Sequence, residues 1–208
     1  MRSACFFHQR YTANSRRPSG SDHSGKGTFA GQGQVFSMKY IASGQTKYFL
    51  SVMRQPPQAF ASVKGSAEYP SIIGSVTFYE SRYGVLIMAD IGGLPKGYPD
   101  SCQDSIFAFH IHEGGACTGN AEDPFADTGM HWNPAGCPHP FHAGDLPPLF
   151  GNNGYAFSVF LSNRFSLRDV IGKTVVLHRN PDDFHTQPSG NSGQKIACGV
   201  IRSMQSGS

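Results

Sequence analysis

The chain is 208 residues long, with 38% hydrophobic and 15% charged residues, and glycine (25) and proline (14) together make up about 19% of it, against roughly 12% in average chains. This composition favours a turn-rich β domain of ordinary size, and no apolar run reaches the 18 residues of a membrane-spanning helix. The net charge of +3 comes from residues 1–37, which alone sum to +4, so the rest of the chain lacks the basic character of a nucleic-acid-binding domain.

Residues 1–45 are rich in serine, glycine, arginine and glutamine and show no hydrophobic period. This pattern predicts a disordered or non-native N-terminal tail, with Met38 as a candidate natural start. Residues 20–28 spell a glycine-lysine loop, but no apolar strand precedes it and no helical pattern follows, so we interpret the match as chance. The first apolar stretch, residues 4–7, is too short for a secretion signal. We therefore favour a cytoplasmic or non-classically exported protein over a secreted or periplasmic one.

From about residue 58 the chain changes to short apolar or alternating runs separated by glycine, proline and aspartate. Seven runs have the length and composition of strands: 60–64, 72–79, 85–91, 106–112, 155–161, 174–178 and 196–201. The first three resemble a meander, and no stretch predicts more than the one helical turn at 167–171. The sequence therefore predicts an all-β fold, an antiparallel Greek-key sandwich or barrel of about eight strands with long loops, over residues 58–202, followed by a tail at 203–208.

A long irregular segment, residues 114–148, interrupts the series of strands. Loops of this length are usually functional or disordered. This one holds Phe125, Trp132 and Phe141 together with several histidines, which argues against disorder. We therefore expect a folded, functional loop.

Histidines stand at the ends of two predicted strands. His110 and His112 are two residues apart, so both side chains point to the same face, roughly 7 Å apart along the strand. This pair alone fits a metal site and a polar strand face equally well. His178 ends another apolar strand, where a single histidine is more often a satisfied polar residue than a ligand. Asp182 or Asp183 can accept a hydrogen bond from a ligand histidine.

A denser cluster lies in the long loop and consists of His131, His139, His142 and Asp145. Prolines at positions 138, 140 and 147 oppose a helix here, so the loop must fold around something else. Three imidazoles and one carboxylate fill a tetrahedral zinc site with no open position, which is the structural kind. The alternative is a polar loop without a ligand, which would leave these ionisable groups without an organising centre.

The number of ligands connects the clusters. Six histidines and one aspartate are seven ligands, whereas two four-coordinate ions need eight, so one imidazole must be shared. His131 lies between the clusters in the sequence and is the candidate bridge. Copper(II), which suits all-nitrogen coordination, is then assigned to His110, His112, His131 and His178, and zinc to His131, His139, His142 and Asp145.

With these clusters, the chain resembles the copper/zinc superoxide dismutase family, bacterial type, over about residues 59–201. The matching motifs occur in order: FAFHIHEGG at 107–115, His131 followed by Asn133 and Pro134, His139, HAGDLP at 142–147, VVLHRNPDD at 175–183, PSGNSG at 188–193 and KIACGVI at 195–201. The resemblance implies the same fold, one copper and one zinc ion per subunit with the ligands assigned above, and superoxide as substrate. We expect no nucleic-acid or membrane partner, and a homodimer is compatible with the sequence.

Position by position, the resemblance implies that Asp182 links a copper histidine to a zinc histidine. It also implies a disulfide between Cys117 and Cys198, with buried free thiols as the alternative in a reducing compartment. Cys102 and Cys137 have no partner in the family pattern and are candidates for a second bridge.

Lys195 departs from the family, which has an arginine three residues before the second disulfide cysteine. Lysine keeps the positive charge that attracts superoxide but lacks the planar fork that orients it, so we expect retained but reduced activity. The alternative is that Lys195 is only a solvated residue at the start of a strand. The loop between His178 and Lys195 is short and carries few charges, which predicts weak steering of the substrate.

The expected reaction is the conversion of superoxide to O₂ and H₂O₂ by redox cycling of copper, with His131 and Lys195 as the catalytic residues. His131 takes up and returns a proton while zinc holds the ring. One alternative is a non-catalytic copper/zinc-binding protein on the same fold. Another is a different metalloenzyme, such as a zinc hydratase or a cupin, neither of which needs the set of His139, His142 and Asp145.

Overall fold

The computed structural model describes residues 43–97 and 105–204. The predicted tail at 1–45 lies outside the described residues except for its last three, and Cys102 and residues 205–208 also lie outside them.

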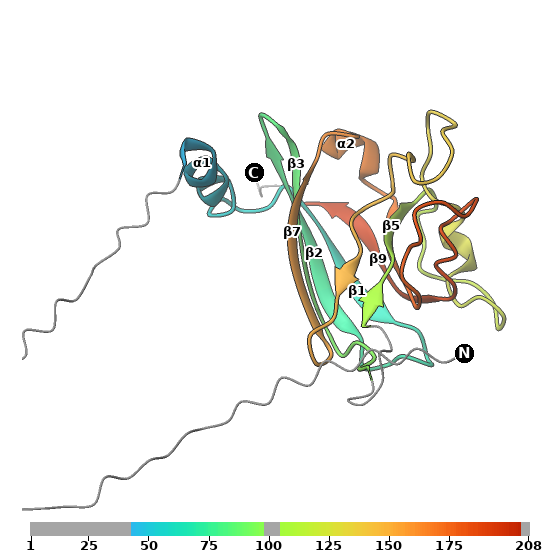
Figure 1. Ribbon diagram of the computed structural model, residues 1–208. Coiled ribbons are helices and arrows are strands. Elements are labelled where there is room, and N and C mark those ends of the chain that lie inside the picture. The colour runs from blue at the N-terminus through green and yellow to red at the C-terminus, as the bar shows by residue number, and fades with distance from the viewer. Residues whose placement is uncertain (1–42, 98–104, 205–208) are drawn as a thin grey trace, which may run out of the picture. The chain divides into compact units, whose positions relative to one another are not determined.

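An antiparallel sheet of seven strands forms the body of the fold (Figure 1). Its strands, in chain order, are β1 (Ala59–Gly65), β2 (Ile73–Ser81), β3 (Gly84–Gly92), β5 (Phe109–His112), β7 (Tyr155–Ser162), β8 (Thr174–His178) and β9 (Lys195–Ser203). Their spatial order is β5-β8-β9-β1-β2-β3-β7, and β4 (Ile106–Phe107) pairs separately with β6 (Leu149–Phe150). Strands distant in the chain therefore lie side by side, and the predicted all-β, antiparallel Greek-key fold is confirmed.

Alternation along the strands explains why the sheet curls around one core. In β1, Ala59, Ala61 and Val63 are buried, while the residues between them point outward. Ala61 is paired with Val76 on one side and Ile201 on the other, so all three strands present their apolar faces to the same interior. The largest fully buried side chains include Phe78, Phe107, Phe109, Ile111 and Leu149.

The predicted strand at 106–112 is interrupted at Ala108. The Ala108 N–H donates to the carbonyl of Asn180 at 2.9 Å, and its own carbonyl accepts the His178 N–H at 2.9 Å. These bonds to the end of β8 and to the residues just after it divide the segment, so β4 pairs with β6 and β5 pairs with β8. Neither β4 nor β6 was predicted as a separate element, because each is only two residues long.

The helix α1 (Gly44–Val52) was not predicted. Ser43 caps it by accepting the Thr46 N–H at 3.1 Å, and the Tyr48 hydroxyl accepts the Arg82 N–H at 2.9 Å. The helix is therefore stabilised by a contact with Arg82 in the β2–β3 hairpin, which cannot be predicted from the sequence of the helix itself. The single turn predicted at 167–171 is present as α2 (Leu167–Val170). Among the described residues no helix has both the length and the apolar character needed to cross a membrane.

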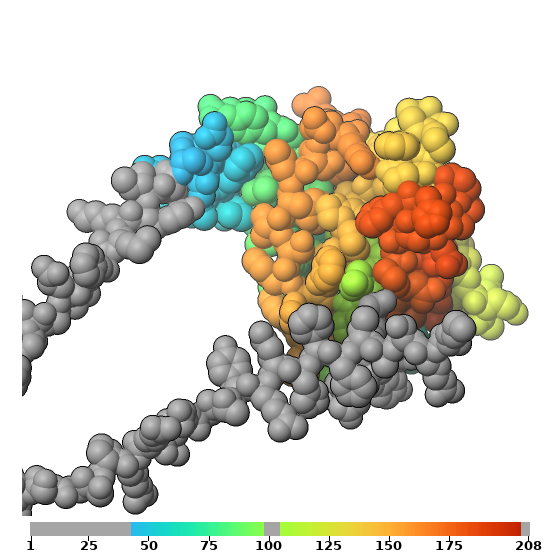
Figure 2. All heavy atoms as spheres, viewed as in Figure 1, coloured from blue at the N-terminus to red at the C-terminus, as the bar shows by residue number. Residues whose placement is uncertain are grey.

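Two loops cover the β5–β8 side of the sheet, the long segment at 113–148 and the segment at 179–194 between β8 and β9 (Figure 1). They pack against each other in the space-filling view (Figure 2). A reciprocal pair of bonds joins them, since the His139 N–H donates to Gln187 Oε1 at 2.9 Å and Gln187 Nε2 donates to the His139 carbonyl at 2.7 Å. The long loop is thus held in place at His139, one of the metal ligands predicted from the sequence.

Candidate metal centre

Two neighbouring strands supply the first three histidines. His110 and His112 lie on β5, and His178 ends β8, the strand paired with β5. All three side chains are buried. A fourth histidine, His131, comes from the long loop, which runs beside β5 because the Trp132 N–H donates to the Ile111 carbonyl at 2.8 Å.

The long loop turns back to β5 a second time and brings its own polar residues with it. The Ile111 N–H donates to the Gly144 carbonyl at 2.8 Å. A Cβ atom at position 144 would overlap the Ile111 carbonyl oxygen, so glycine permits this approach. The neighbouring His142 and Asp145 are buried there, and so is His139.

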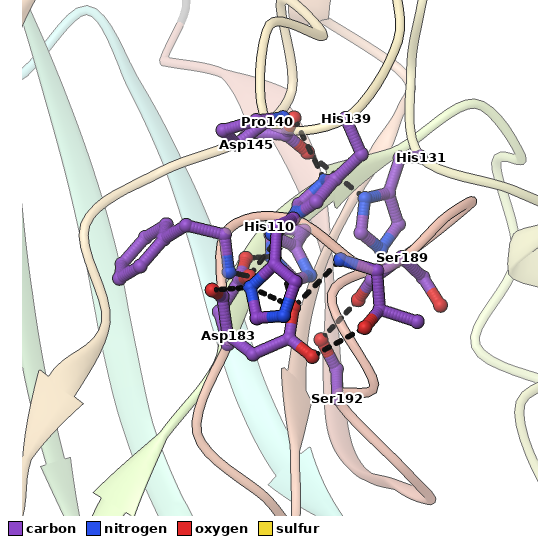
Figure 3. Close-up of polar contacts among 12 residues, drawn as sticks. His110, His131, His139, Pro140, Asp145, Asp183, Ser189 and Ser192 are labelled. Atoms are coloured by element: carbon purple, nitrogen blue, oxygen red, sulfur yellow. Dashed lines mark hydrogen bonds and ion pairs between the residues drawn. The ribbon is translucent and has the colours of Figure 1, made fainter.

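Seven side chains thus form two groups that share His131. The strand set is His110, His112, His131 and His178, and the loop set is His131, His139, His142 and Asp145. Within each set the candidate ligand atoms lie within 4.8 Å of one another, and every member is buried. In Figure 3, His110, His131, His139 and Asp145 point toward one another. The structure therefore brings together every ligand residue that the sequence singled out.

Hydrogen bonds on the outer edges of the strand-set rings decide which nitrogens face inward. His112 Nδ1 lies 2.9 Å from the Gly129 carbonyl and His178 Nδ1 lies 3.2 Å from the Gly193 carbonyl, so each must donate there. Their Nε2 atoms then carry lone pairs, yet they stand only 3.1 Å apart. Two facing lone pairs repel each other unless a cation lies beside them.

The other two rings of the strand set, His110 and His131, also direct an unprotonated nitrogen inward. His110 Nε2 lies 2.8 Å from Asp182 Oδ2, which leaves Nδ1 as the inward atom. His110 Nδ1 and His131 Nε2 are both buried and have no hydrogen-bond partner. Buried polar atoms are rarely left unpaired, because desolvation without a partner is costly. Four inward lone pairs without protons between them fit a bound metal ion such as copper.

The loop set surrounds a carboxylate in the same way. Asp145 Oδ1 lies 2.9 Å from His131 Nδ1 and 3.3 Å from His142 Nδ1, and Asp145 Oδ2 lies 3.1 Å from His139 Nδ1. His139 donates through Nε2 to Asp182 Oδ1 at 2.9 Å, so its Nδ1 presents a lone pair to the anion. That contact is repulsive without a cation. Three imidazole nitrogens and one carboxylate oxygen fit zinc with no open position.

Burial prepares both sets for a cation. Desolvation, together with repulsion between the histidines, holds the pKa of His110 and of His112 well below the usual value and lowers the pKa of His178 to about 4. Burial acts to raise the pKa of Asp145, but the hydrogen bond with His131 and the nearby histidine charges outweigh it, and the pKa falls. His110, His112 and His178 are therefore neutral and Asp145 is ionised near neutral pH, as metal ligation requires.

Asp182 connects the two sets. One carboxylate oxygen meets His110 and the other meets His139, and the residue is buried. Gly190 has a φ of +66°, and a Cβ there would overlap both Asp182 and His139, so the loop needs glycine at this point. Asp183, the other aspartate considered from the sequence, instead accepts bonds from the Thr186 and His185 N–H groups at 2.8 and 3.0 Å.

Lys195 is held at the edge of the strand set. It is the partner of His178 across β8 and β9, and its ammonium donates to Asp123 Oδ2 at 2.8 Å and to the Phe125 carbonyl at 3.1 Å. Its side chain is 15% exposed, so it is not a solvated residue. Asp123 was not singled out from the sequence, because a carboxylate in an irregular loop, 72 residues from its partner, has no distinguishing spacing.

A disulfide joins Cys117 to Cys198, with a Cα–Cα distance of 5.7 Å. It fastens the start of the long loop to β9, and the expectation of this bridge is confirmed. Cys137 has no disulfide partner among the described residues. Because Cys102 lies outside them, the second bridge stays a prediction.

Comparison with known proteins gives one consistent match. Residues 72–201 match the family described as copper/zinc superoxide dismutase. The chain is 35% identical to superoxide dismutase [Cu-Zn] 2 of Aquifex aeolicus over 146 residues, which is 63% of this chain and 80% of the relative. It is 38% identical to superoxide dismutase [Cu-Zn] of Legionella pneumophila over 141 residues, which is 64% of this chain and 80% of that protein. The chain therefore belongs to the copper/zinc superoxide dismutase family.

Proposed function

We propose that this chain, an oxidoreductase, dismutates superoxide at copper held by the strand set, next to zinc held by the loop set. The family match and the names of the relatives support the activity. The observation that carries the assignment of residues is the His131 ring. Its Nδ1 lies 2.9 Å from Asp145 in the loop set, while its Nε2 is buried without a hydrogen-bond partner in the strand set.

Copper bound by the strand set supplies one-electron redox chemistry, so that two superoxide ions and two protons give one O₂ and one H₂O₂. His131 Nε2 is the atom that can hold a proton for this reaction, because it lies at the strand set and has no other partner. Its Nδ1 stays directed at Asp145, which keeps the ring in place while the proton comes and goes.

The remaining residues orient this centre. Asp182 fixes the rings of His110 and His139 by accepting from both, which also sets the tautomer of each ring. Lys195 places a positive charge beside His178, where an incoming anion is attracted. The loop set, with four ligands and no open position, serves as a structural site.

The test is superoxide decay measured on the full chain after reconstitution with copper and zinc, with zinc alone, and with neither. We expect decay far faster than an equal concentration of free copper produces, and only in the copper-loaded protein. His110→Ala should abolish it, whereas His185→Ala should leave it unchanged, because the His185 side chain is 79% exposed and outside both sets. A copper-loaded protein no faster than free copper would instead favour a non-catalytic metal-binding protein.

A further inference from the structure

A partly buried ion pair stands beside the strand set. Lys195 begins β9 opposite His178, and its ammonium contacts Asp123 Oδ2 at 2.8 Å. The lysine side chain is 15% exposed and the aspartate side chain 39%. The lysine also donates to the Phe125 carbonyl at 3.1 Å, so its ammonium is fixed by two acceptors from one turn of the long loop.

Asp123 is itself held from several directions. Its Oδ1 accepts the Phe125 N–H at 3.0 Å, and its own N–H donates to Asn120 Oδ1 at 2.9 Å. Its carbonyl accepts the N–H groups of Asn120 and Ala126 at 3.0 and 3.1 Å. Because backbone and side chain are both bonded, the carboxylate is presented to Lys195 in a defined position.

The pair carries no net charge next to the proposed copper ligands. Burial acts to raise the pKa of Asp123, but the hydrogen bond and charge of Lys195 and the Phe125 N–H outweigh it and lower the pKa, so the carboxylate stays ionised. Lys195 is the partner of His178 across β8 and β9, so its charge lies beside the strand set. The negative charge of Asp123 reduces the attraction that Lys195 exerts on an anion approaching the strand set.

Building on the proposed function, we propose that Asp123 is a positioning residue that holds Lys195 and cancels its charge. Asp123 thereby sets how strongly the copper face attracts superoxide and other small anions. Glu122, the adjacent acidic residue, is exposed and forms no hydrogen bond or ion pair with Lys195 among the described residues, so the relationship is specific to Asp123.

The experiment compares Asp123→Asn with Glu122→Gln in the copper- and zinc-loaded full chain. Asparagine removes the charge and keeps one acceptor oxygen, which can bond to the Phe125 N–H or to Lys195 but not to both. We expect Asp123→Asn to raise the rate of superoxide decay about two- to threefold at low ionic strength, with a steeper fall as salt is added. The dissociation constant of azide, followed by optical titration of the copper, should fall by about the same factor. Glu122→Gln should change both quantities much less.

A second variant keeps the proposal testable if Asp123→Asn does not fold. Lys195→Gln leaves the Asp123 carboxylate unpaired, so azide should bind more weakly and superoxide decay should become faster, not slower, as salt screens the repulsion. The proposal is overturned if Asp123→Asn matches the parent protein or Glu122→Gln in azide affinity and salt dependence. It is also overturned if Lys195→Gln keeps the salt dependence of the parent protein.

The azide titration also separates this proposal from the proposed function. Azide affinity can be measured on the copper-loaded chain whether or not the chain removes superoxide. A parent protein no faster than free copper would contradict the proposed function while leaving the comparison of the variants readable.

Discussion

Asp145 Oδ1 lies 2.9 Å from Nδ1 of His131, so the Nδ1 edge of that imidazole faces the loop set. The opposite nitrogen is then directed into the strand set, where it is buried without a partner. The His131 ring thus faces both sets. The hydrogen bonds around each set fix which nitrogen of each histidine carries the proton.

Replacing the linking carboxylate should weaken metal binding. In Asp182→Asn, only one side-chain oxygen remains to accept a ring N–H, and the amide N–H₂ would face the N–H of the other histidine. We expect the affinity for metal to fall about 10- to 100-fold, measured by competition with a chelator. The matched control is Asp183→Asn, since Asp183 contacts Thr186 and His185 rather than either set. Equal affinities in the two variants would contradict the role of Asp182.

The metal-free protein should lose stability in acid because of its buried histidines. His178 has a folded-state pKa of about 4, whereas the unfolded chain takes up this proton near 6.5. Its contribution to the free energy of unfolding is complete above pH 6.5 and is lost as the pH falls toward 4. The lowered pKa values of His110 and His112 act in the same direction.

From His178 alone, the free energy of unfolding at pH 5 should be about 2 kcal/mol lower than at pH 7.5. Urea denaturation of the metal-free chain at both pH values measures the difference. A free energy of unfolding that does not change between these pH values would show that the histidines are not buried in their neutral form.

The disulfide should contribute substantially to stability, because Cys117 and Cys198 are 81 residues apart. Constraining a loop of that length in the unfolded chain is worth about 4 kcal/mol. We expect the variant with Cys117→Ser and Cys198→Ser to lose stability of that order in urea denaturation. Peptide mapping without reductant should recover this pair in the parent protein, and its absence there would refute the bridge.

The helix α1 should be stabilised mainly through Tyr48. The Tyr48 hydroxyl accepts the Arg82 N–H at 2.9 Å, the Arg82 guanidinium lies 4.4 Å from the centre of the ring, and the Tyr83 ring centre is 5.7 Å away. Tyr48→Phe should cost about 1 kcal/mol and Tyr48→Ala about 2 kcal/mol in urea denaturation. Leu50→Ala, at a position 46% exposed, should change stability by less than about 0.5 kcal/mol. A loss as large in Leu50→Ala would contradict this role of Tyr48.

Periodicity predicted the sheet well where a strand has one buried face. The alternation of Ala59, Ala61 and Val63 is visible in the sequence, and so is the apolar run of β8. The interruption at Ala108 could not be predicted, because it depends on bonds to Asn180 and His178, about 70 residues away. The helix α1 was missed for the same reason, since its contact with Arg82 spans 34 residues.

The sequence predicted the candidate metal ligands, but it did not predict the residues that orient them. The seven candidate ligands are histidines and an aspartate with a distinctive spacing, so all seven could be identified from the sequence. The carbonyls of Gly129 and Gly193, which orient His112 and His178, have no such mark, because every residue has a carbonyl. Asp123 was missed because its partner lies in another part of the chain.

The shared ring of His131 is tested most directly by anomalous diffraction at the copper and zinc absorption edges, from crystals of the fully metallated chain. We expect copper next to Nε2 of His131 and zinc next to Nδ1, each with the other members of its set. A single ion per chain, or two ions of which only one touches His131, would contradict the account.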